Sequence, residues 1–383
     1  MHATRFVAGI LLLIASATGC GSGDRSAGLA GVSKAASSLS SKADRRQENG
    51  IRVETRNLYL GADLTPVIAA QDFATFIAAT TAAWAMVQRN DFHARVKALA
   101  AEIAANRPAL IGLQEAYTWR TQTPADGSAT PATQVAYDYV PELLAALKAR
   151  GLEYRSVAQV ELLDFEAPTL LGNDARLTDR GVILARKDVN TRNPTGVVFA
   201  NENLLPVTVL GQTLLVKRGY VAVDVKHQGE WLRFVSTHLE SFHPGIRMLQ
   251  AGELAVALAT ETRPVVLVGD LNSHPGTEGA AILAGAGFRD VWAELHPGRP
   301  GLTCCWPEDL TKSTPGFSER IDYVLFRGPL EPRAAAVSGA DPASRVAGLW
   351  PSDHGGLFAE LRLEEQEDDS EDEQREERRT SVK

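Results

Sequence analysis

Short apolar runs of strand length recur along this chain, and helical patterns separate several of them. The run 109–113 follows a proline and contains no polar side chain, which predicts a buried strand. Residues 51–55 alternate apolar with charged side chains, as in a half-buried strand. Further strands are predicted over 181–185, 220–225, 231–237, 264–268, 321–326 and 357–361. Helical periodicity over 92–103, 246–259 and 277–286 lies between these strands without strict alternation, which predicts an α+β fold rather than a Rossmann or barrel fold.

Polar segments follow four of the predicted strands. They are Gln114-Glu115, the stretches 236–240 and 269–274, and 352–355. Any one of them taken alone is typical of a turn, because Asp, Asn, Ser and Gly commonly end strands. Together they repeat carboxylates, amides and imidazoles, whereas a Gly-x-Ser-x-Gly elbow, a phosphate loop and a catalytic cysteine are absent. This combination favours a hydrolase that uses a hard metal ion.

The oxygen-bearing side chains at these positions indicate the kind of metal. They are Glu115, Asp270, Asn57, Asn272 and Asp353. Such a set suits Mg, with Mn or Ca as alternatives, better than zinc, which prefers nitrogen and sulfur ligands. A hard cation neutralises a phosphoryl group, and a nearby histidine can transfer protons at neutral pH. The predicted reaction is therefore phosphoryl transfer to water.

Composition excludes several other classes of protein. The 383 residues are 44% hydrophobic and 22% charged, which is typical of a soluble globular chain with one large or two small domains. Three cysteines rule out a disulfide scaffold and a four-thiolate zinc site. Between residues 51 and 363 acidic side chains outnumber basic ones and no basic block occurs, so the broad positive surface of a duplex-binding module is missing.

The two ends of the chain differ from its middle. Residues 1–19 resemble a signal peptide, and the sequence before Cys20 resembles a lipobox, so we predict an exported lipoprotein with lipid attached at Cys20. Cleavage after the small residues 15–17, giving a periplasmic or secreted protein, is the alternative. Residues 20–50 predict a flexible tether, 51–363 the folded domain, and 364–383 an acidic disordered tail.

Six motifs in one order carry a resemblance to a known family. They are Asn57-Leu58, Leu113-Gln114-Glu115, Thr237-His238-Leu239, Gly269-Asp270-Leu271-Asn272, Arg320-Ile321-Asp322-Tyr323 and Ser352-Asp353-His354. The series resembles the endonuclease/exonuclease/phosphatase superfamily, which includes deoxyribonuclease I, sphingomyelinases and inositol polyphosphate 5-phosphatases. The resemblance implies a four-layer α/β/β/α sandwich, with two mixed sheets packed face to face, helices outside, and an active site at one edge.

The resemblance also implies roles for individual residues. Glu115 matches the main metal carboxylate, Asn57 the amide that places metal or phosphate, and Asp353 a metal ligand or its neighbour. The remaining matches are catalytic, and they are Asp270, Asn272, His238, His354 and Asp322. Of these, His354 is implied to activate or polarise the attacking water, Asp322 to orient the His354 ring, and His238 to donate a proton to the leaving oxygen. The family leaves the division of acid and base among His238, His354 and Asp270 open.

Several other residues have two interpretations. Arg180 is expected either to contact phosphate or to be a surface arginine, and Asp63 either to reach the site or to serve a turn. His243 and His274 are interpreted as turn residues. Cys304 and Cys305 form either a strained vicinal disulfide or a pair of buried thiols, because neighbouring Cα atoms lie closer than the usual disulfide range. Neither state is predicted to be catalytic.

The sequence therefore predicts an exported, metal-dependent phosphoesterase, most simply a phosphodiesterase. Its substrate is left open between nucleic acid and phospholipid, and a lipid anchor would hold it at a membrane. The alternative is a catalytically silent lipoprotein that uses the same fold for binding. The metal carboxylate, both histidines and the Asp-x-Asn pair are all present, which favours the enzyme. No motif identifies a protein partner.

Overall fold

The computed structural model describes residues 50–312 and 316–364. The predicted signal peptide, Cys20, nearly all of the tether and nearly all of the acidic tail lie outside these residues. The described residues belong to one compact unit. Its first strand, β1 (Ile51–Asn57), begins at the predicted start of the domain, and its last, β16 (Gly356–Leu363), ends at the predicted end.

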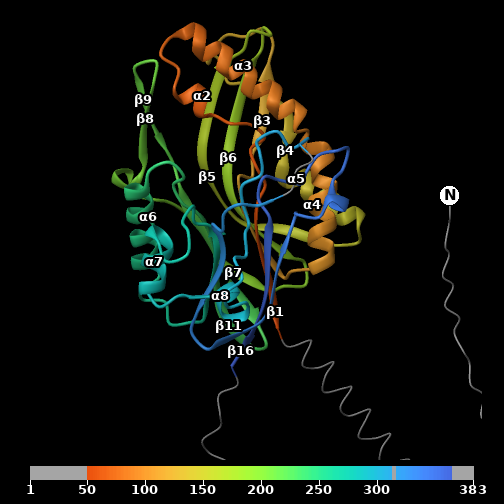
Figure 1. Cartoon of the computed structure of the whole chain (residues 1–383), viewed down its shortest axis with the longest axis vertical. Coiled ribbons are helices and arrows are strands. Elements are labelled where there is room, and N and C mark those ends of the chain that lie inside the picture. The colour runs from red at the N-terminus through yellow and green to blue at the C-terminus, as the bar shows by residue number, and fades with distance from the viewer. Residues whose placement is uncertain (1–49, 313–315, 365–383) are drawn as a thin grey trace, which may run out of the picture. The chain divides into compact units, whose positions relative to one another are not determined.

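Two mixed β-sheets form the centre of this unit (Figure 1). The larger sheet has the order β15 (Leu330–Ser338), β16, β1, β2 (Leu110–Gln114), β6 (Asp174–Arg186), β3 (Thr118–Gln122), β4 (Gln134–Asp138), with β5 (Tyr154–Pro168) also paired to β6. The smaller has the order β13 (Arg289–Asp290), β14 (Asp322–Arg327), β12 (Val265–Asp270), β11 (Glu230–His238), β10 (Gly219–His227), β7 (Thr191–Val198). A separate hairpin joins β8 (Leu205–Val209) to β9 (Gln212–Val216).

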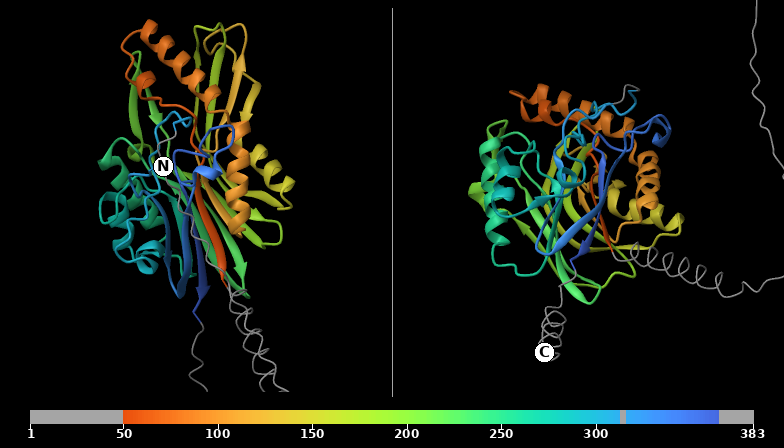
Figure 2. Two further views of the ribbon diagram at one scale, coloured as in Figure 1. Left: turned by 45° about the vertical axis from the view of Figure 1, so that its right-hand side comes forward. Right: turned by 60° about the horizontal axis from the view of Figure 1, so that its bottom comes forward.

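Helices cover the outer faces of both sheets, so the unit has four layers (Figure 2). On the larger sheet lie α3 (Phe73–Arg89), α4 (Phe92–Asn106) and α5 (Tyr139–Ala149); on the smaller lie α6 (Pro244–Ala257) and α7 (Glu278–Gly285). The shorter helices are α2 (Thr65–Ile68), α8 (Val291–Leu295), η1 (Asn201–Asn203) and η2 (Pro342–Ser344). The predicted α+β sandwich is confirmed. No helix among the described residues is long and apolar enough to cross a membrane.

The inner faces of the sheets pack against each other through aliphatic side chains such as Val53, Val268 and Phe326. Gly112 lies where the two sheets are in close contact, because a Cβ there would be 2.5 Å from Cγ2 of Val268 and 2.6 Å from Oγ of Ser236. Only a residue without a side chain fits this position without a shift of its neighbours. The close approach brings the ends of strands from both sheets together.

Each run that was predicted to be a strand overlaps a strand of the structure, and the three predicted helices are also present. The burial of residues 51–55 was predicted wrongly. The strand is buried on both faces, including Glu54 and Arg56, because β1 is a central strand between β16 and β2. Arg56 is neutralised there, since its Nη2 lies 2.9 Å from Oε2 of Glu102. The alternation of apolar and charged residues in this strand predicted one solvent-exposed face, but both faces of β1 are covered.

Candidate active site

The register of the strands places most of the predicted site residues side by side. In the smaller sheet His238 pairs with Asp270 across β11 and β12, and Asp270 pairs with Asp322 across β12 and β14. In the larger sheet Asn57, the last residue of β1, pairs with Gln114, the last residue of β2. Glu115 follows β2 directly. The structure therefore brings these residues to one edge of the sandwich.

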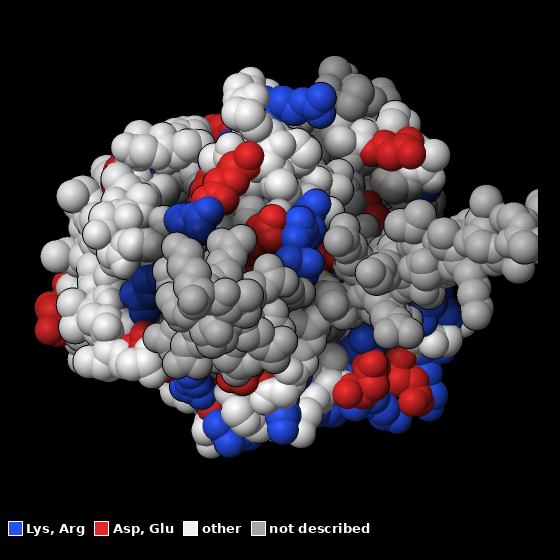
Figure 3. Space-filling view, turned by 90° about the horizontal axis from the view of Figure 1, so that it is seen from below, with Lys and Arg blue, Asp and Glu red and all other residues white. Residues whose placement is uncertain are grey.

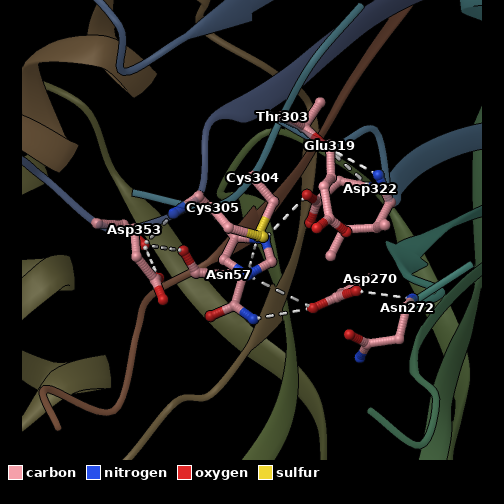
Figure 4. Close-up of a disulfide and its surroundings, with 12 residues drawn as sticks. Asn57, Asp270, Asn272, Thr303, Cys304, Cys305, Glu319, Asp322 and Asp353 are labelled. Atoms are coloured by element: carbon pink, nitrogen blue, oxygen red, sulfur yellow. Dashed lines mark hydrogen bonds and ion pairs between the residues drawn. A yellow bond between two sulfur atoms is a disulfide. The ribbon is translucent and has the colours of Figure 1, made fainter. Parts of the chain in front are cut away.

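Asn57 links the carboxylates of the two sheets. Its Nδ2 donates a hydrogen bond of 3.1 Å to Oε1 of Glu115 and another of 3.1 Å to Oδ2 of Asp270, the second of which is drawn in Figure 4. Its Oδ1 accepts from the backbone N–H of Tyr59 at 2.9 Å, and Oε2 of Glu115 accepts from that of Leu60 at 2.7 Å. In this orientation Asn57 places the Glu115 and Asp270 carboxylates rather than directing an oxygen at them.

Two of these positions have left-handed backbone conformations. Glu115 has a φ of 54° and Asn272 a φ of 49°, which are unusual for residues other than glycine. Such a conformation costs about 1 kcal/mol or more, and it persists where surrounding contacts enforce it, often at functional sites. At Asn272 the contacts are an N–H donated to Oδ1 of Asp270 at 2.9 Å and an Nδ2–H donated to the carbonyl of Leu239 at 3.0 Å.

His354 is held by Asp322 and is positively charged at neutral pH. Its Nδ1 lies 2.9 Å from Oδ2 of Asp322, and its Nε2 lies 3.8 Å from Oδ2 of Asp270. Burial opposes the charge, but Asp322, Asp353 and Asp270 outweigh it and raise the pKa of His354 well above its usual value. His354 thus presents a cationic Nε2–H beside Asp270.

His238 is neutral for the opposite reason. Nη1 of Arg218 lies 2.8 Å from Nδ1 of His238, and because an arginine only donates, Nδ1 is the acceptor. The proton of His238 is therefore on Nε2, which lies 3.4 Å from Oδ2 of Asp270. Burial, the charge of Arg218 and the charge of His354 lower the pKa of His238 well below 6.5. Asp270 thus lies between a charged and a neutral imidazole.

The carboxylates at this edge are crowded enough to favour a cation. Burial and Asp322 raise the pKa of Asp270 to about 7, and burial and Glu115 raise that of Asp353 to about 6, although His354 opposes both shifts. Oδ1 of Asp322 is buried without a hydrogen-bond partner. Carboxylate oxygens of Asp270 and Asp322 lie within 4.8 Å of each other and of a ring nitrogen of His354, which in its charged form offers no lone pair to a metal. A divalent cation would relieve this repulsion, so the residues fit a metal site.

A cleft with a volume of about 250 Å³ opens beside these residues. Glu115 and Asp353 line it, as does Asp63, whose Oδ1 also accepts from the N–H of Thr65 at 2.7 Å. Both interpretations of Asp63 thus apply, because it serves a turn and faces the cleft. Within the described part of the chain, the charged side chains that line the cleft are those of Asp63, Glu115, Asp179, Lys217, Arg218, Glu308 and Asp353. Acidic groups outnumber basic ones, which again favours a bound cation.

Other predicted residues lie outside this cleft. Nη2 of Arg180 lies 2.7 Å from Oδ1 of Asp138, and its Nε donates to the carbonyl of Ala116. The guanidinium of Arg180 is thus paired with Asp138 and the backbone, and it does not line the cleft. His243 is the N-cap residue of α6, and its Nδ1 accepts from the N–H of Ile246 at 3.2 Å. Nε2 of His274 lies 3.7 Å from Oε2 of Glu319.

Three residues of the site were missed by sequence reasoning. Arg218 follows an exposed hairpin, and only its place in a Lys-Arg-Gly segment before a strand would have indicated it. Asp179 immediately precedes Arg180, and Asp179 rather than Arg180 lines the cleft. Burial raises the pKa of Asp179 to about 7, although the charge of Arg218 opposes this shift. Cys304 forms a disulfide with Cys305, which resolves the two alternatives, and its Sγ lies 3.4 Å from Nε2 of His354 (Figure 4).

Comparison with known proteins gives the same family as the six motifs. The sequence model described as "Endonuclease/Exonuclease/phosphatase family" matches residues 84–354. A family structure from Bacteroides thetaiotaomicron aligns with a TM-score of 0.51 at 14% identity, covering 82% of this chain and 98% of its own. One from Bacteroides vulgatus aligns with a TM-score of 0.50 at 16% identity, covering 82% and 99%. A humanized D. rerio TDP2 gives 0.48 at 17%, covering 82% and 99%. No curated protein matches the sequence.

Proposed function

This chain belongs to the endonuclease/exonuclease/phosphatase family, and we propose that it is a metal-dependent phosphodiesterase. Members of the family are generally hydrolases of phosphate esters that depend on divalent metals. The observation that carries the proposal is the position of Asp270, which lies between Nε2 of His238 and Nε2 of His354 and is tied through Asn57 to Glu115. A site that had lost its activity would not need two imidazoles held in opposite protonation states.

The residues present fit a divalent cation, for which we propose Mg, with Mn or Ca as alternatives. Glu115 and Asp353 would hold it, because both carboxylates line the cleft and repel each other. When bound, such an ion supplies charge neutralisation at the phosphoryl oxygens and lowers the pKa of water. Asn57 keeps the carboxylate of Glu115 in place through its Nδ2.

The protonation states divide the catalytic work among the other residues. The carboxyl of Asp270 has a pKa of about 7, so it can accept the proton of the attacking water near neutral pH. The charged Nε2–H of His354 would bind a phosphoryl oxygen, with Asp322 retaining the charge on the ring. The neutral Nε2–H of His238 would donate a hydrogen bond to the leaving oxygen. Asn272 holds Asp270 in position through its backbone N–H.

An apolar groove beside the cleft favours a phospholipid over a nucleic acid. Leu64, Ile68, Leu163 and Val216 line both the cleft and the groove, so the two spaces adjoin. The groove continues between α2, β5 and the β8–β9 hairpin, and every residue that lines it is apolar. A nucleic acid would instead require basic side chains along its backbone. Among the described residues only two basic ones line the cleft. Figure 3 shows the opposite end of the sandwich, where β1 begins and β16 ends, and there basic and acidic side chains are interspersed.

The location of the protein is proposed from the sequence. We propose that residues 1–19 direct export, that Cys20 carries lipid, and that residues 20–50 tether the domain to a membrane, with release into the periplasm or medium as the alternative. A phospholipid substrate agrees with this location. So does the Cys304–Cys305 disulfide, because such bonds persist mainly in oxidising compartments.

Hydrolysis assays on the purified full chain test the proposal. The substrates are phosphatidylcholine and sphingomyelin vesicles, plasmid DNA, RNA, inositol phosphates and bis-p-nitrophenyl phosphate, each with Mg, Mn or EDTA. We expect metal-dependent turnover of vesicles that Glu115→Gln and His238→Ala both abolish. His296→Asn is the matched control, because that ring lies 3.1 Å from the carbonyl of Ala335 and outside the cleft.

Other outcomes of these assays separate the alternatives. Turnover of DNA or RNA instead of vesicles would identify a nuclease and reject the lipid substrate. No turnover on any of these substrates, from a protein that circular dichroism shows to be folded, would reject the enzyme. The catalytically silent binding module on the same fold would then be the better description.

A further inference from the structure

The Cys304–Cys305 disulfide lies against the catalytic histidine. Sγ of Cys304 is 3.4 Å from Nε2 of His354, the ring nitrogen that also faces Asp270. The side of the pair next to His354 is closed to solvent, since Cys304 is only 3% exposed, whereas Cys305 is exposed. Figure 4 shows the two cysteines among Asn57, Asp270 and Asp322. Cys304 thus contacts the site, while its disulfide partner Cys305 is an exposed residue.

The residues on either side of the disulfide hold the backbone of the segment that carries His354. The carbonyl of Thr303 accepts a 2.5 Å hydrogen bond from the N–H of Gly355, and the N–H of Trp306 donates a 3.0 Å bond to the carbonyl of Asp353. These two bonds fall immediately before and after the cysteine pair. The disulfide therefore lies in the middle of a short segment whose two ends are hydrogen-bonded to the backbone of residues 353 and 355.

The same loop also holds the carboxylate partner of His354. Oγ1 of Thr303 accepts from the backbone N–H of Asp322 at 3.2 Å. Cys304 itself is fixed by Glu319, because its N–H donates to that carbonyl at 3.0 Å and its own carbonyl accepts the N–H of Glu319 at 2.8 Å. Both members of the Asp322–His354 pair are thus positioned by residues next to or within the disulfide.

We propose that the Cys304–Cys305 disulfide is a redox-controlled positioning element of this active site, and that its reduction by a dithiol lowers turnover. The proposal rests on the phosphoesterase function proposed above. Cys304 contacts His354 and does not line the cleft, so it acts through the histidine. Neither cysteine belongs to any of the six motifs.

The chemistry of reduction begins at the sulfur of the exposed residue Cys305. A thiolate of the dithiol attacks Sγ of Cys305, the bond between the two cysteine sulfurs breaks, and Sγ of Cys304 leaves as a thiolate that takes up a proton. The second thiol of the reagent then attacks the mixed disulfide and releases Cys305. The protein gains two electrons and two protons, and the dithiol becomes a cyclic disulfide.

Reduction changes the contact with His354 in two ways. The bond no longer ties the exposed Cys305 to the buried Cys304, so the backbone between Thr303 and Trp306, which is hydrogen-bonded to residues 353–355, is less constrained. Cys304 also gains an S–H where the disulfide sulfur had only an acceptor. Displacement of a catalytic group by about 1 Å costs on the order of 10²-fold in rate. The loss should appear in kcat, because the affected groups act on the reacting phosphate.

The test uses the full chain carrying Cys20→Ser, so that Cys304 and Cys305 are the remaining cysteines. One sample is kept oxidised, and the other is treated with dithiothreitol and then desalted, which removes any metal-chelating reagent. Titration with Ellman's reagent counts the free thiols in each. We expect kcat to fall about tenfold or more on reduction while KM changes less than about twofold. Reoxidation with oxidised glutathione should restore kcat.

Cys305→Ser is the matched variant, since it cannot form the bond and leaves Cys304 beside His354. We expect its kcat at the level of the reduced protein and no response to dithiothreitol. The proposal is overturned if the reduced protein, with both thiols titrated, turns over at the oxidised rate. Full turnover by a folded Cys305→Ser would overturn it equally.

A second measurement does not depend on turnover or on that variant. The imidazole proton signals of His354, identified by their loss in His354→Asn, should shift between the oxidised and reduced full chain. Unshifted signals would reject the contact between the disulfide and the histidine. If the oxidised chain shifts these signals on reduction but hydrolyses none of the substrates, the phosphoesterase function fails while the redox-dependent positioning of His354 stands.

Discussion

Two histidines of the same site are held in opposite protonation states, and the residue at Nδ1 of each ring contributes to this difference. Asp322 lies 2.9 Å from Nδ1 of His354, and Arg218 lies 2.8 Å from Nδ1 of His238. A carboxylate at that nitrogen retains a proton on the ring, whereas a guanidinium excludes one. Asp270 therefore faces one charged and one neutral donor. This asymmetry lets one carboxylate act as a base without competition from either ring.

Replacement of Arg218 should change how the activity depends on pH. Burial is the main cause of the low pKa of His238 and the charge of Arg218 adds to it, so in Arg218→Met that pKa should rise toward 6.5 and the ring should take up its proton at a higher pH. We expect the acidic limb of the kcat/KM profile to move upward in pH, so that activity falls more at about pH 6 than at about pH 8. Arg186→Met removes an arginine that pairs with Asp188 outside the cleft, and it should leave the profile unchanged. An unmoved limb in Arg218→Met would contradict the role given to this arginine.

Asp322 and His354 should behave as one unit. Asp322→Asn leaves the shape of the side chain but removes the charge that retains the proton of His354, so we expect a loss of kcat of about 10²-fold or more. His354→Asn should cost at least as much. If the pair acts together, the double variant loses little beyond the larger single loss. If instead the fold-loss of kcat in the double variant equals the product of the two single fold-losses in steady-state kinetics, the two residues act separately.

The strands that carry the site were the most predictable elements. Continuous apolar runs such as those in β2 and β12 are buried on both faces, which leaves a clear signal in the sequence. The half-exposed β5 and the exposed β8–β9 hairpin were not predicted, because their residues mix polar and apolar side chains without a strict period. Helix α3 was also missed, since alanines and threonines fill most of its length.

The same contrast applies to the site. Residues at the ends of buried strands, such as His238 and Asp270, were predicted because a motif marks each of them. Arg218 and Cys304 come from segments whose position depends on tertiary pairing, Arg218 after the hairpin and Cys304 in a loop bonded to Glu319 and beside His354. No local pattern of residues indicates which strand end such a segment will reach.

The closeness of the two sheets at Gly112 should be measurable as stability. In Gly112→Ala the new Cβ meets Cγ2 of Val268 at 2.5 Å, so the sheets or those side chains must shift. Overpacking of this kind costs about 1–3 kcal/mol in the free energy of unfolding. Gly252→Ala, at an open position within α6, is the matched control and should raise stability by up to about 1 kcal/mol. Equal denaturant midpoints for the two variants would show that the interface has room for a methyl group.

At the scale of the whole molecule, acidic groups are concentrated where a substrate with negative charge must bind. Five carboxylates and two basic side chains line the cleft among the described residues. Without a cation this arrangement repels a phosphate ester and also strains the fold, because several of the carboxyls are buried. Metal binding, substrate binding and the stability of the fold are therefore coupled through the same few residues.

This coupling predicts how metal and pH together affect the melting temperature. Burial and neighbouring carboxylates raise the pKa of Asp270 to about 7 and that of Asp353 to about 6, above the ordinary 3.8. A raised carboxyl pKa stabilises the fold fully below the unfolded-state value, and this contribution is lost as the pH rises through the folded-state value. The metal-free protein should thus lose these contributions between about pH 5 and pH 8. A divalent cation replaces the lost protons, so its stabilising effect should grow over the same range.

Thermal unfolding in Mg and in EDTA, at about pH 5.5 and about pH 8, isolates the effect. Buried groups such as Glu54, whose pKa is raised to about 7 by burial far from any metal ligand, affect both samples equally and cancel in the difference. His238 cancels as well, because its lowered pKa destabilises the fold increasingly as the pH falls below about 6.5 in both samples alike. We expect the gain in melting temperature from Mg to be larger at the higher pH. Glu115→Gln should reduce that gain at pH 8, because it removes the carboxylate proposed to hold the ion. A gain that is the same at both pH values would mean that the cation binds away from Asp270 and Asp353.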